Sequence, residues 1–212
     1  VWDIPAESIT HINYAFADAT LQGGCEIYDS WAAIDKDGGN YNLLQDLKAS
    51  HPHLKTLISL GGWSLSGEFS DIALTADRRE AFVSDCVDFM IAYGFDGIDV
   101  DWEYPGGGGL TDNYRAEDKE NFTLLLSEFR TQLDALGQGH LLTIAGPGGD
   151  DKIANMEVAD VVDLLDWVNV MTYDFHGGWE STTGFNAPLY PSSASPFAKE
   201  TTHNVDGSIN QW

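Results

Sequence analysis

The chain has 212 residues, of which 43% are hydrophobic and 12% aromatic, so it can bury one sizeable hydrophobic core. Its 34 acidic residues against 10 Lys and Arg give a formal net charge of -24, which repels nucleic-acid phosphates and anionic lipid. No apolar run approaches the roughly 18 residues of a membrane-spanning helix, so neither nucleic acid nor a membrane is an expected partner.

Short apolar segments alternate along the chain with longer segments whose apolar residues recur every three or four positions. The predicted strands are 10–17, 54–61, 95–103, 140–146 and 166–173, and the predicted helices are 40–50, 75–94, 115–137 and 156–165. A further helix is expected to begin in the last ten residues, HNVDGSINQW. This order is typical of a parallel sheet covered by helices.

Glycine and proline gather just after the predicted strands, as in GGW, YPGGGG, GPGGD and FHGGW. The loops at the carboxyl ends of the strands are therefore the elaborated ones, and ligands bind at that edge of parallel sheets. No glycine-rich phosphate loop opens a helix, so an α/β barrel is favoured over a doubly wound sheet. The whole of 1–212 is expected to form a single domain.

The predicted strand 95–103, FDGIDVDWE, carries one apolar and one acidic face. Asp99, Asp101 and Glu103 alternate with bulky apolar residues, so the three acids point the same way at roughly 6.6 Å intervals. Burial and like charge both disfavour full ionisation, so at least one carboxyl is expected to hold a proton near neutral pH. A protonated Glu beside ionised aspartates is the arrangement that glycosidases use for general acid catalysis.

Two other roles for the acidic strand are weaker. A calcium loop of the EF-hand type needs a glycine where Tyr104 stands and does not alternate with bulky apolar residues. A structural strand paired with buried arginine is disfavoured because the arginines all fall in predicted helices or loops: Arg78, Arg79, Arg115 and Arg130. We expect neither a metal nor a cofactor.

Aromatic residues lie at or just beyond the predicted strand ends, where flat rings could stack on sugars, although aromatic side chains more often belong to a core. They are Trp63, Tyr104, Tyr173 and Trp179. Trp102 has the opposite parity to the acids and is predicted to face the covering helices.

Histidine and cysteine add little to these site predictions. His176 and His203 have no partner at metal-ligand spacing and are predicted to be surface or loop residues. Two cysteines are too few for a disulfide framework, and Cys86 lies at helical spacing within an apolar stripe, which predicts a buried free thiol.

Four segments in the right order make the chain resemble the chitinases of glycoside hydrolase family 18. DGIDVDWEYP resembles the D-x-x-D-x-D-x-E signature of the family, SLGG its S-x-G-G strand, HINYAFA its second strand and MTYD its sixth. MTYDFHGGW looks most like the bacterial branch. The resemblance implies a (β/α)8 TIM barrel of which this chain covers roughly strands two to six, truncated at both ends, so that the fragment alone is expected to be inactive.

The resemblance assigns roles to the matched acids, using the N-acetyl group of the substrate as the nucleophile. Glu103 would protonate the glycosidic oxygen and later activate water. Asp101 would orient the acetamido group and balance the charge of the oxazolinium intermediate, while Asp99 shares a proton with it. Asp96, of opposite parity, is expected to hold the start of the strand.

Other matched residues would shape the substrate site. Tyr173 would donate a hydrogen bond to the acetamido carbonyl, and Ser59 would support Asp99 from the neighbouring strand. Further residues would orient the substrate or line the cleft: Tyr104, Asp174, Met171, Phe16 and Trp63.

The expected activity is endo-acting or processive hydrolysis of β-1,4-linked N-acetylglucosamine in chitin with retention of configuration. The same fold also serves non-catalytic chitin-binding lectins, which typically replace the acid at the position of Glu103, and endo-β-N-acetylglucosaminidases. The resemblance further implies a secreted monomer that binds chitin or N-acetylglucosamine oligosaccharides, with a signal peptide outside this sequence.

Overall fold

The computed structural model describes residues 1–137, 139–195, 197, 199 and 201–212. Its strands are β1 (His11–Thr20), β2 (Gly24–Ile27), β3 (Lys55–Gly61), β4 (Gly97–Asp101), β5 (Leu141–Pro147) and β6 (Trp167–Met171). Its α-helices are α1 (Asn40–Ser50), α2 (Phe69–Ile72), α3 (Ala76–Ala92), α4 (Asp118–Ala135), α5 (Asp150–Ile153), α6 (Val158–Val162) and α7 (Val205–Ile209). All five predicted strands are present, and each predicted helix contains an observed one.

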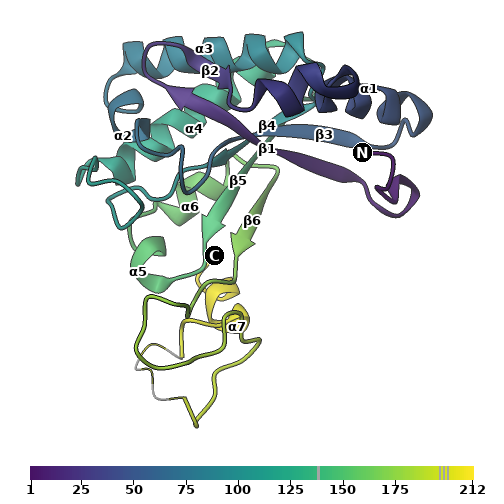
Figure 1. The fold of residues 1–212 in the computed structure, drawn as a ribbon. Coiled ribbons are helices and arrows are strands. Elements are labelled where there is room, and N and C mark those ends of the chain that lie inside the picture. The colour runs from purple at the N-terminus through teal and green to yellow at the C-terminus, as the bar shows by residue number, and fades with distance from the viewer. Residues whose placement is uncertain (138, 196, 198, 200) are drawn as a thin grey trace.

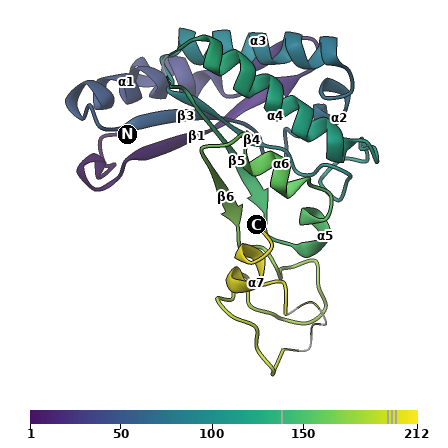
Figure 2. The same ribbon diagram turned by 180° about the vertical axis from the view of Figure 1, so that it is seen from behind.

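The strands form one twisted sheet in the order β2-β1-β3-β4-β5-β6 (Figure 1). The pairs from β1 to β6 are parallel, whereas β2 pairs antiparallel with the end of β1. Figures 1 and 2 show α1, α3 and α4 on the same side of this sheet. The carboxyl ends of the parallel strands therefore meet along one edge, which positions the loops that follow them.

Side-chain alternation divides the sheet into an apolar face and a polar face. Ile98 and Val100 of β4 join Trp102 in the hydrophobic core beneath the helices, as predicted. The Trp102 ring stacks on Phe69 of α2 at 5.5 Å between ring centroids and meets Phe122 of α4 edge-on. The residues between them in sequence face the other way, and that face carries the acids.

Two parallel strands, β4 and β6, each follow an aspartate that accepts a backbone N–H from the strand before it in sequence. Asp96, before β4, accepts a hydrogen bond from the Thr56 N–H at 2.9 Å and pairs with Lys48 of α1 at 2.5 Å. Burial alone would raise the pKa of Asp96, but these bonds hold it below its ordinary value. Asp166, before β6, likewise accepts the N–H of Leu142 at 2.8 Å. The prediction that Asp96 holds the strand start is confirmed.

The prediction of a free thiol is wrong, because Cys25 and Cys86 form a disulfide. Cys25 lies on β2, a strand that the sequence pattern did not reveal, and the β1–β2 hairpin turns it towards α3, which carries Cys86. Both residues are buried, as Cys86 was expected to be. The bond ties the antiparallel edge of the sheet to the helix that covers it.

The chain end packs against the carboxyl end of β5. The hydroxyl of Ser208 in α7 donates to the Gly148 carbonyl at 2.6 Å, and the indole of Trp212 donates to the Pro147 carbonyl at 3.0 Å. Figure 1 shows α7 beyond the ends of β5 and β6. In the part of the chain that the structure describes, no helix is both long and apolar enough to cross a membrane.

Replacing both cysteines, as in Cys25→Ser with Cys86→Ser, is expected to lower the free energy of unfolding by about 2–4 kcal/mol, because the bond closes a loop between residues 61 apart. Urea denaturation of both forms, with and without reductant, measures this. Reductant should bring the wild type down to the double variant and leave the variant unchanged. A wild type of unaltered stability in reductant would contradict the prediction.

Candidate active site

The acids of β4 lie at the carboxyl end of the strand and beyond it. Asp99 and Asp101 are buried, with 4% and 6% of their surfaces exposed. The strand ends at Asp101, two residues earlier than predicted, so Glu103 sits in the following loop and is half-buried. The order of depth predicted from the alternation is the observed one.

Asp99 accepts hydrogen bonds from three other strands of the sheet. Its Oδ2 accepts the Ser59 hydroxyl of β3 at 2.7 Å, the contact that the sequence predicted. Its Oδ1 accepts the Thr143 hydroxyl of β5 at 2.5 Å and the Asn169 amide of β6 at 3.1 Å. These three donors fix the orientation of the Asp99 carboxyl group. The predictions omitted Thr143 and Asn169, and their alternation with apolar neighbours on adjacent strands is the signal that could have found them.

Asp101 differs from Asp99 because one of its carboxyl oxygens accepts no hydrogen bond from the described residues. Its Oδ1 is buried and has no hydrogen-bond partner among the described residues. Burial, and then the charges of Glu103 and Asp99, raise the pKa of Asp101 to about 8. The carboxyl is therefore protonated at neutral pH, as at least one acid of this strand was expected to be. The oxygen without a partner leaves capacity for a hydrogen bond to a ligand.

Burial also raises the pKa of Glu103, against a hydrogen bond with Tyr104 that lowers it, and the charge of Asp174 raises it further. Tyr104 is half-buried, and the Lys152 ammonium lies 5.4 Å from the centre of its ring. The site thus holds two carboxyls with raised pKa values, Asp101 and Glu103. Acids that retain a proton near neutral pH can serve as proton donors.

The loop after β6 brings further predicted residues to the same edge. Tyr173 is 53% exposed, and burial together with the charges of Asp101 and Glu103 raises the pKa of its hydroxyl. Asp174 has a left-handed backbone, with φ of 54°, and accepts a hydrogen bond from the Asn186 amide at 2.8 Å. Asn186 was not predicted, because it lies outside any regular element.

The remaining predicted residues lie around these acids. Met171 is the last residue of β6 and is half-buried. Phe16 of β1 lies against the end of β3, since a Cβ at Gly62 would come within 2.7 Å of its ring. Trp63 and Trp179 are 49% and 68% exposed, so their rings are accessible to a ligand.

His176 and His203 both lie in loops, as predicted, but neither is a surface residue without partners. His176 is buried rather than superficial, stacks on Phe197 and lies 2.9 Å from a carboxylate oxygen of Glu180. His203 does meet possible metal ligands, because the chain end folds back onto the loop after β5. The ligand atoms of Asp150, Asp151 and His203 lie within 4.8 Å of one another.

That group is the candidate for a metal ion among the described residues, and a lysine already balances its charge. The Lys199 ammonium lies 3.5 Å from a carboxylate oxygen of Asp150 and of Asp151. The arrangement is an ion-pair cluster at the chain surface, separate from the acids of β4.

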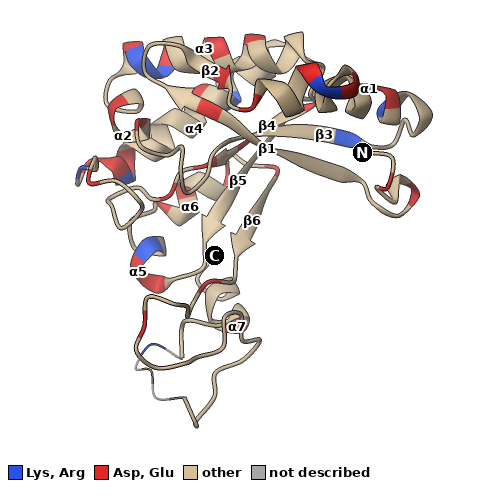
Figure 3. Ribbon diagram, viewed as in Figure 1, with Lys and Arg blue, Asp and Glu red and all other residues tan. Residues whose placement is uncertain are grey.

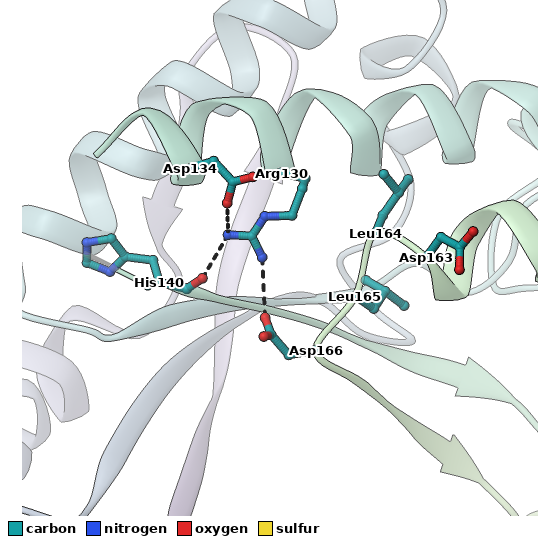
Figure 4. Close-up of a pocket in the computed structure, with 8 residues that line it drawn as sticks. Arg130, Asp134, His140, Asp163, Leu164, Leu165 and Asp166 are labelled. Carbon is teal, nitrogen blue, oxygen red and sulfur yellow. Dashed lines mark hydrogen bonds and ion pairs between the residues drawn. The ribbon is translucent and has the colours of Figure 1, made fainter. Parts of the chain in front are cut away.

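A cavity of about 330 Å³ lies at the opposite ends of the strands from Glu103 (Figure 4). Its lining consists of Arg130, Asp134, Gly139, His140, Asp163, Leu164, Leu165 and Asp166. The Arg130 guanidinium pairs with Asp134 at 2.8 Å and Asp166 at 3.3 Å, and donates to the His140 carbonyl at 2.9 Å. These contacts join α4 to the starts of β5 and β6, which is a structural role.

Replacing Asp101 with Asn is expected to remove a pH-dependent part of the stability. The folded pKa is raised from 3.8 to about 8, so the stabilisation is complete below about pH 4 and is lost as the pH rises through about 8. Unfolding by urea from pH 4 to 9 should show the wild type losing, relative to Asp101→Asn, on the order of 5 kcal/mol, because one pKa unit corresponds to about 1.4 kcal/mol. Asp88→Asn, on the exposed face of α3, controls for the lost charge. Parallel curves for wild type and Asp101→Asn would refute the expectation.

Comparison with known proteins agrees with the predicted resemblance. The sequence model of "Glycosyl hydrolases family 18" matches residues 2–212. Chitinase A1 of Niallia circulans is 42% identical over 92% of this chain and 34% of that protein. Chitinase ChiA74 from Bacillus thuringiensis is 39% identical with a TM-score of 0.91, over 99% of this chain and 42% of that one.

A third relative has been solved with a sugar oligomer. Catalytic domain 2 of the Ostrinia furnacalis Group II chitinase, as an E2180L mutant with a penta-N-acetylchitooctaose, is 33% identical with a TM-score of 0.89, over 100% of this chain and 54% of that one. The chain thus spans a third to about half of the length of these relatives. The prediction of a partial TIM barrel is confirmed, since the sheet matches part of the barrels of these enzymes. The chain belongs to glycoside hydrolase family 18.

Proposed function

We propose that the protein is a chitinase that cleaves β-1,4-linked N-acetylglucosamine polymers by substrate-assisted, retaining catalysis. The observation that carries the proposal is the row of acids along β4 and the loop after it. Asp99 accepts three hydrogen bonds, Asp101 is buried with one oxygen that has no partner among the described residues, and Glu103 is half-buried beyond the strand end. The family relatives named above are chitinases, and one of them holds an N-acetylglucosamine oligomer.

In this proposal Glu103 donates its proton to the glycosidic oxygen as the bond to the anomeric carbon breaks. The acetamido carbonyl oxygen of the same sugar attacks that carbon and forms an oxazolinium ion. Asp101 orients the acetamido group and balances the positive charge as it develops, with Asp99 as its partner for the proton. Glu103, now ionised, then takes a proton from the water that opens the ring, so configuration is retained.

The pKa shifts of the site without substrate support these roles for Glu103 and Asp101. Burial and the neighbouring acids raise the pKa of Asp101 to about 8, and burial, with the charge of Asp174, also raises the pKa of Glu103. Three donors hold the Asp99 carboxyl group in place beneath them. Tyr173 lies in the field of the same carboxylates and is proposed to donate its hydroxyl to the acetamido carbonyl. Tyr104, Asp174, Met171, Phe16 and Trp63 complete the cleft.

We also propose that the protein is secreted and acts as a monomer on extracellular chitin. The Cys25–Cys86 disulfide supports secretion, because such bonds persist in oxidising compartments. The acid at position 103 argues against a lectin of the same fold, which would need no proton donor. No metal takes part in the proposed steps.

Replacing Glu103 with Gln is expected to lower turnover by at least about 10²–10⁴, because the proton donor is lost while the shape is kept. Release of a chromophore from an N-acetylglucosamine oligomer conjugate by the full-length protein measures this. Sedimentation with chitin should show binding retained.

Glu120→Gln, on the exposed side of α4, is the matched control and should keep wild-type turnover. Near-normal hydrolysis by Glu103→Gln would remove that residue from its proposed role. A wild type that binds chitin without hydrolysing it would favour the lectin instead.

A further inference from the structure

The hydrogen-bond ladder between β3 and β4 stops short of Glu103. Its last register pair is Gly61 with Asp101, and the Gly62 N–H then donates to the Asp101 carbonyl at 2.8 Å. Glu103 lies two residues beyond this pair. Strand pairing therefore does not hold the backbone of the proposed general acid, and another group must do so.

The hydroxyl of Ser66 occupies the place where the ladder would continue. Ser66 is buried, and its Oγ accepts the Glu103 N–H at 2.9 Å. The same oxygen lies within donating distance of the carbonyls of Asp101, at 3.0 Å, and Gly62, at 2.8 Å. A hydroxyl has one proton and two lone pairs, so it can accept from Glu103 while sharing its proton between the two carbonyls.

We propose that Ser66 is a positioning residue for Glu103, which it holds at the working distance from Asp101 and from the scissile bond. The inference rests on the chitinase function proposed above. Ser66 itself touches neither sugar nor the reacting atoms. It acts through the two backbone groups that flank Trp102.

Contacts on the other sides of the segment show why one hydroxyl can set this geometry. The Trp102 ring is wedged between Phe69 and Phe122, which fixes the helix side of the turn. A Cβ at Gly109 would overlap the Glu103 carbonyl oxygen, so the glycine loop closes over that end of the residue. The Glu103 N–H is the backbone group on the remaining side of the residue, and it donates to the Ser66 hydroxyl.

Losing the Ser66 contact is expected to lower the catalytic rate rather than the affinity for substrate. A displacement of about 1 Å in a catalytic group can cost on the order of 10²-fold in rate. Glu103 and Asp101 also interact through their charges, and the charge of Glu103 is one of the causes that raise the pKa of Asp101. Loosening Glu103 should weaken this coupling and lower the pKa of Asp101.

The test is Ser66→Ala in the full-length enzyme, assayed from pH 4 to 10 on a chromogenic N-acetylglucosamine oligomer. We expect kcat to fall about 10- to 100-fold with KM within about threefold, and the alkaline limb of the kcat profile to move to lower pH. Ser66→Thr, which keeps the hydroxyl, should restore most of kcat. Ser64→Ala, at an exposed serine of the same loop, should match the wild type.

Wild-type kcat and an unmoved alkaline limb in a folded Ser66→Ala enzyme would overturn the inference. So would equal losses in kcat and substrate affinity with the pH profile unchanged, since that pattern reports general loosening of the loop. If near-ultraviolet circular dichroism shows that Ser66→Ala does not fold, Ser66→Cys, with its weaker donor and acceptor, takes its place under the same criteria.

The wild type and Glu103→Gln separate this inference from the proposed function. If the wild type is active and Glu103→Gln is not, an unaffected Ser66→Ala enzyme refutes only the positioning role. If the wild type fails to hydrolyse any chitin oligomer, the proposed function itself fails.

Discussion

The three hydrogen bonds that Asp99 accepts organise the polar face of the sheet. They come from β3, β5 and β6, so one carboxylate joins four parallel strands at the level where the acids begin. Asp99 lies beneath Asp101, and after burial and the charge of Glu103 it is a further cause that raises the pKa of Asp101. The protonated state of the site thus depends on the register of the sheet, which sets these donors opposite Asp99.

Acidic residues far outnumber basic ones in this chain, and two of the few bases hold strand starts. Figure 3 shows Asp and Glu distributed over the helices with scattered Lys and Arg. Lys48 and Arg130 hold the aspartates at the starts of β4 and β6. No ion pair to Asp99, Asp101 or Glu103 appears among the described residues, so no basic partner offsets the burial that raises the pKa values of Asp101 and Glu103. This arrangement suits acids that must keep a proton near neutral pH.

The residues just after β4 are fixed by the core on one side and by a hydrogen bond on the other. Trp102 anchors the turn in the core, and Ser66 fastens the backbone on the opposite side, so Glu103 is held although its strand has ended. Glycines make this possible, because a side chain at Gly61 would strike the Asp101 carbonyl and one at Gly109 the Glu103 carbonyl. The glycine-rich loops after the strands are therefore close-approach positions as well as turns.

The sequence by itself determined the order of strands and helices, the two faces of β4 and the resemblance to family 18, because alternation and short motifs are local properties of the chain. Apart from the Ser59–Asp99 contact that the family resemblance implied, only the tertiary structure decided which residues meet across the sheet. Thr143 and Asn169 lie 44 and 70 residues from Asp99, and Cys86 lies 61 from Cys25, so no local pattern pairs them. The short strand β2 was missed because four residues carry little periodicity, and with it the disulfide. His203 meets Asp150 only because the chain end folds back over β5, a contact that depends on the packing of the whole sheet.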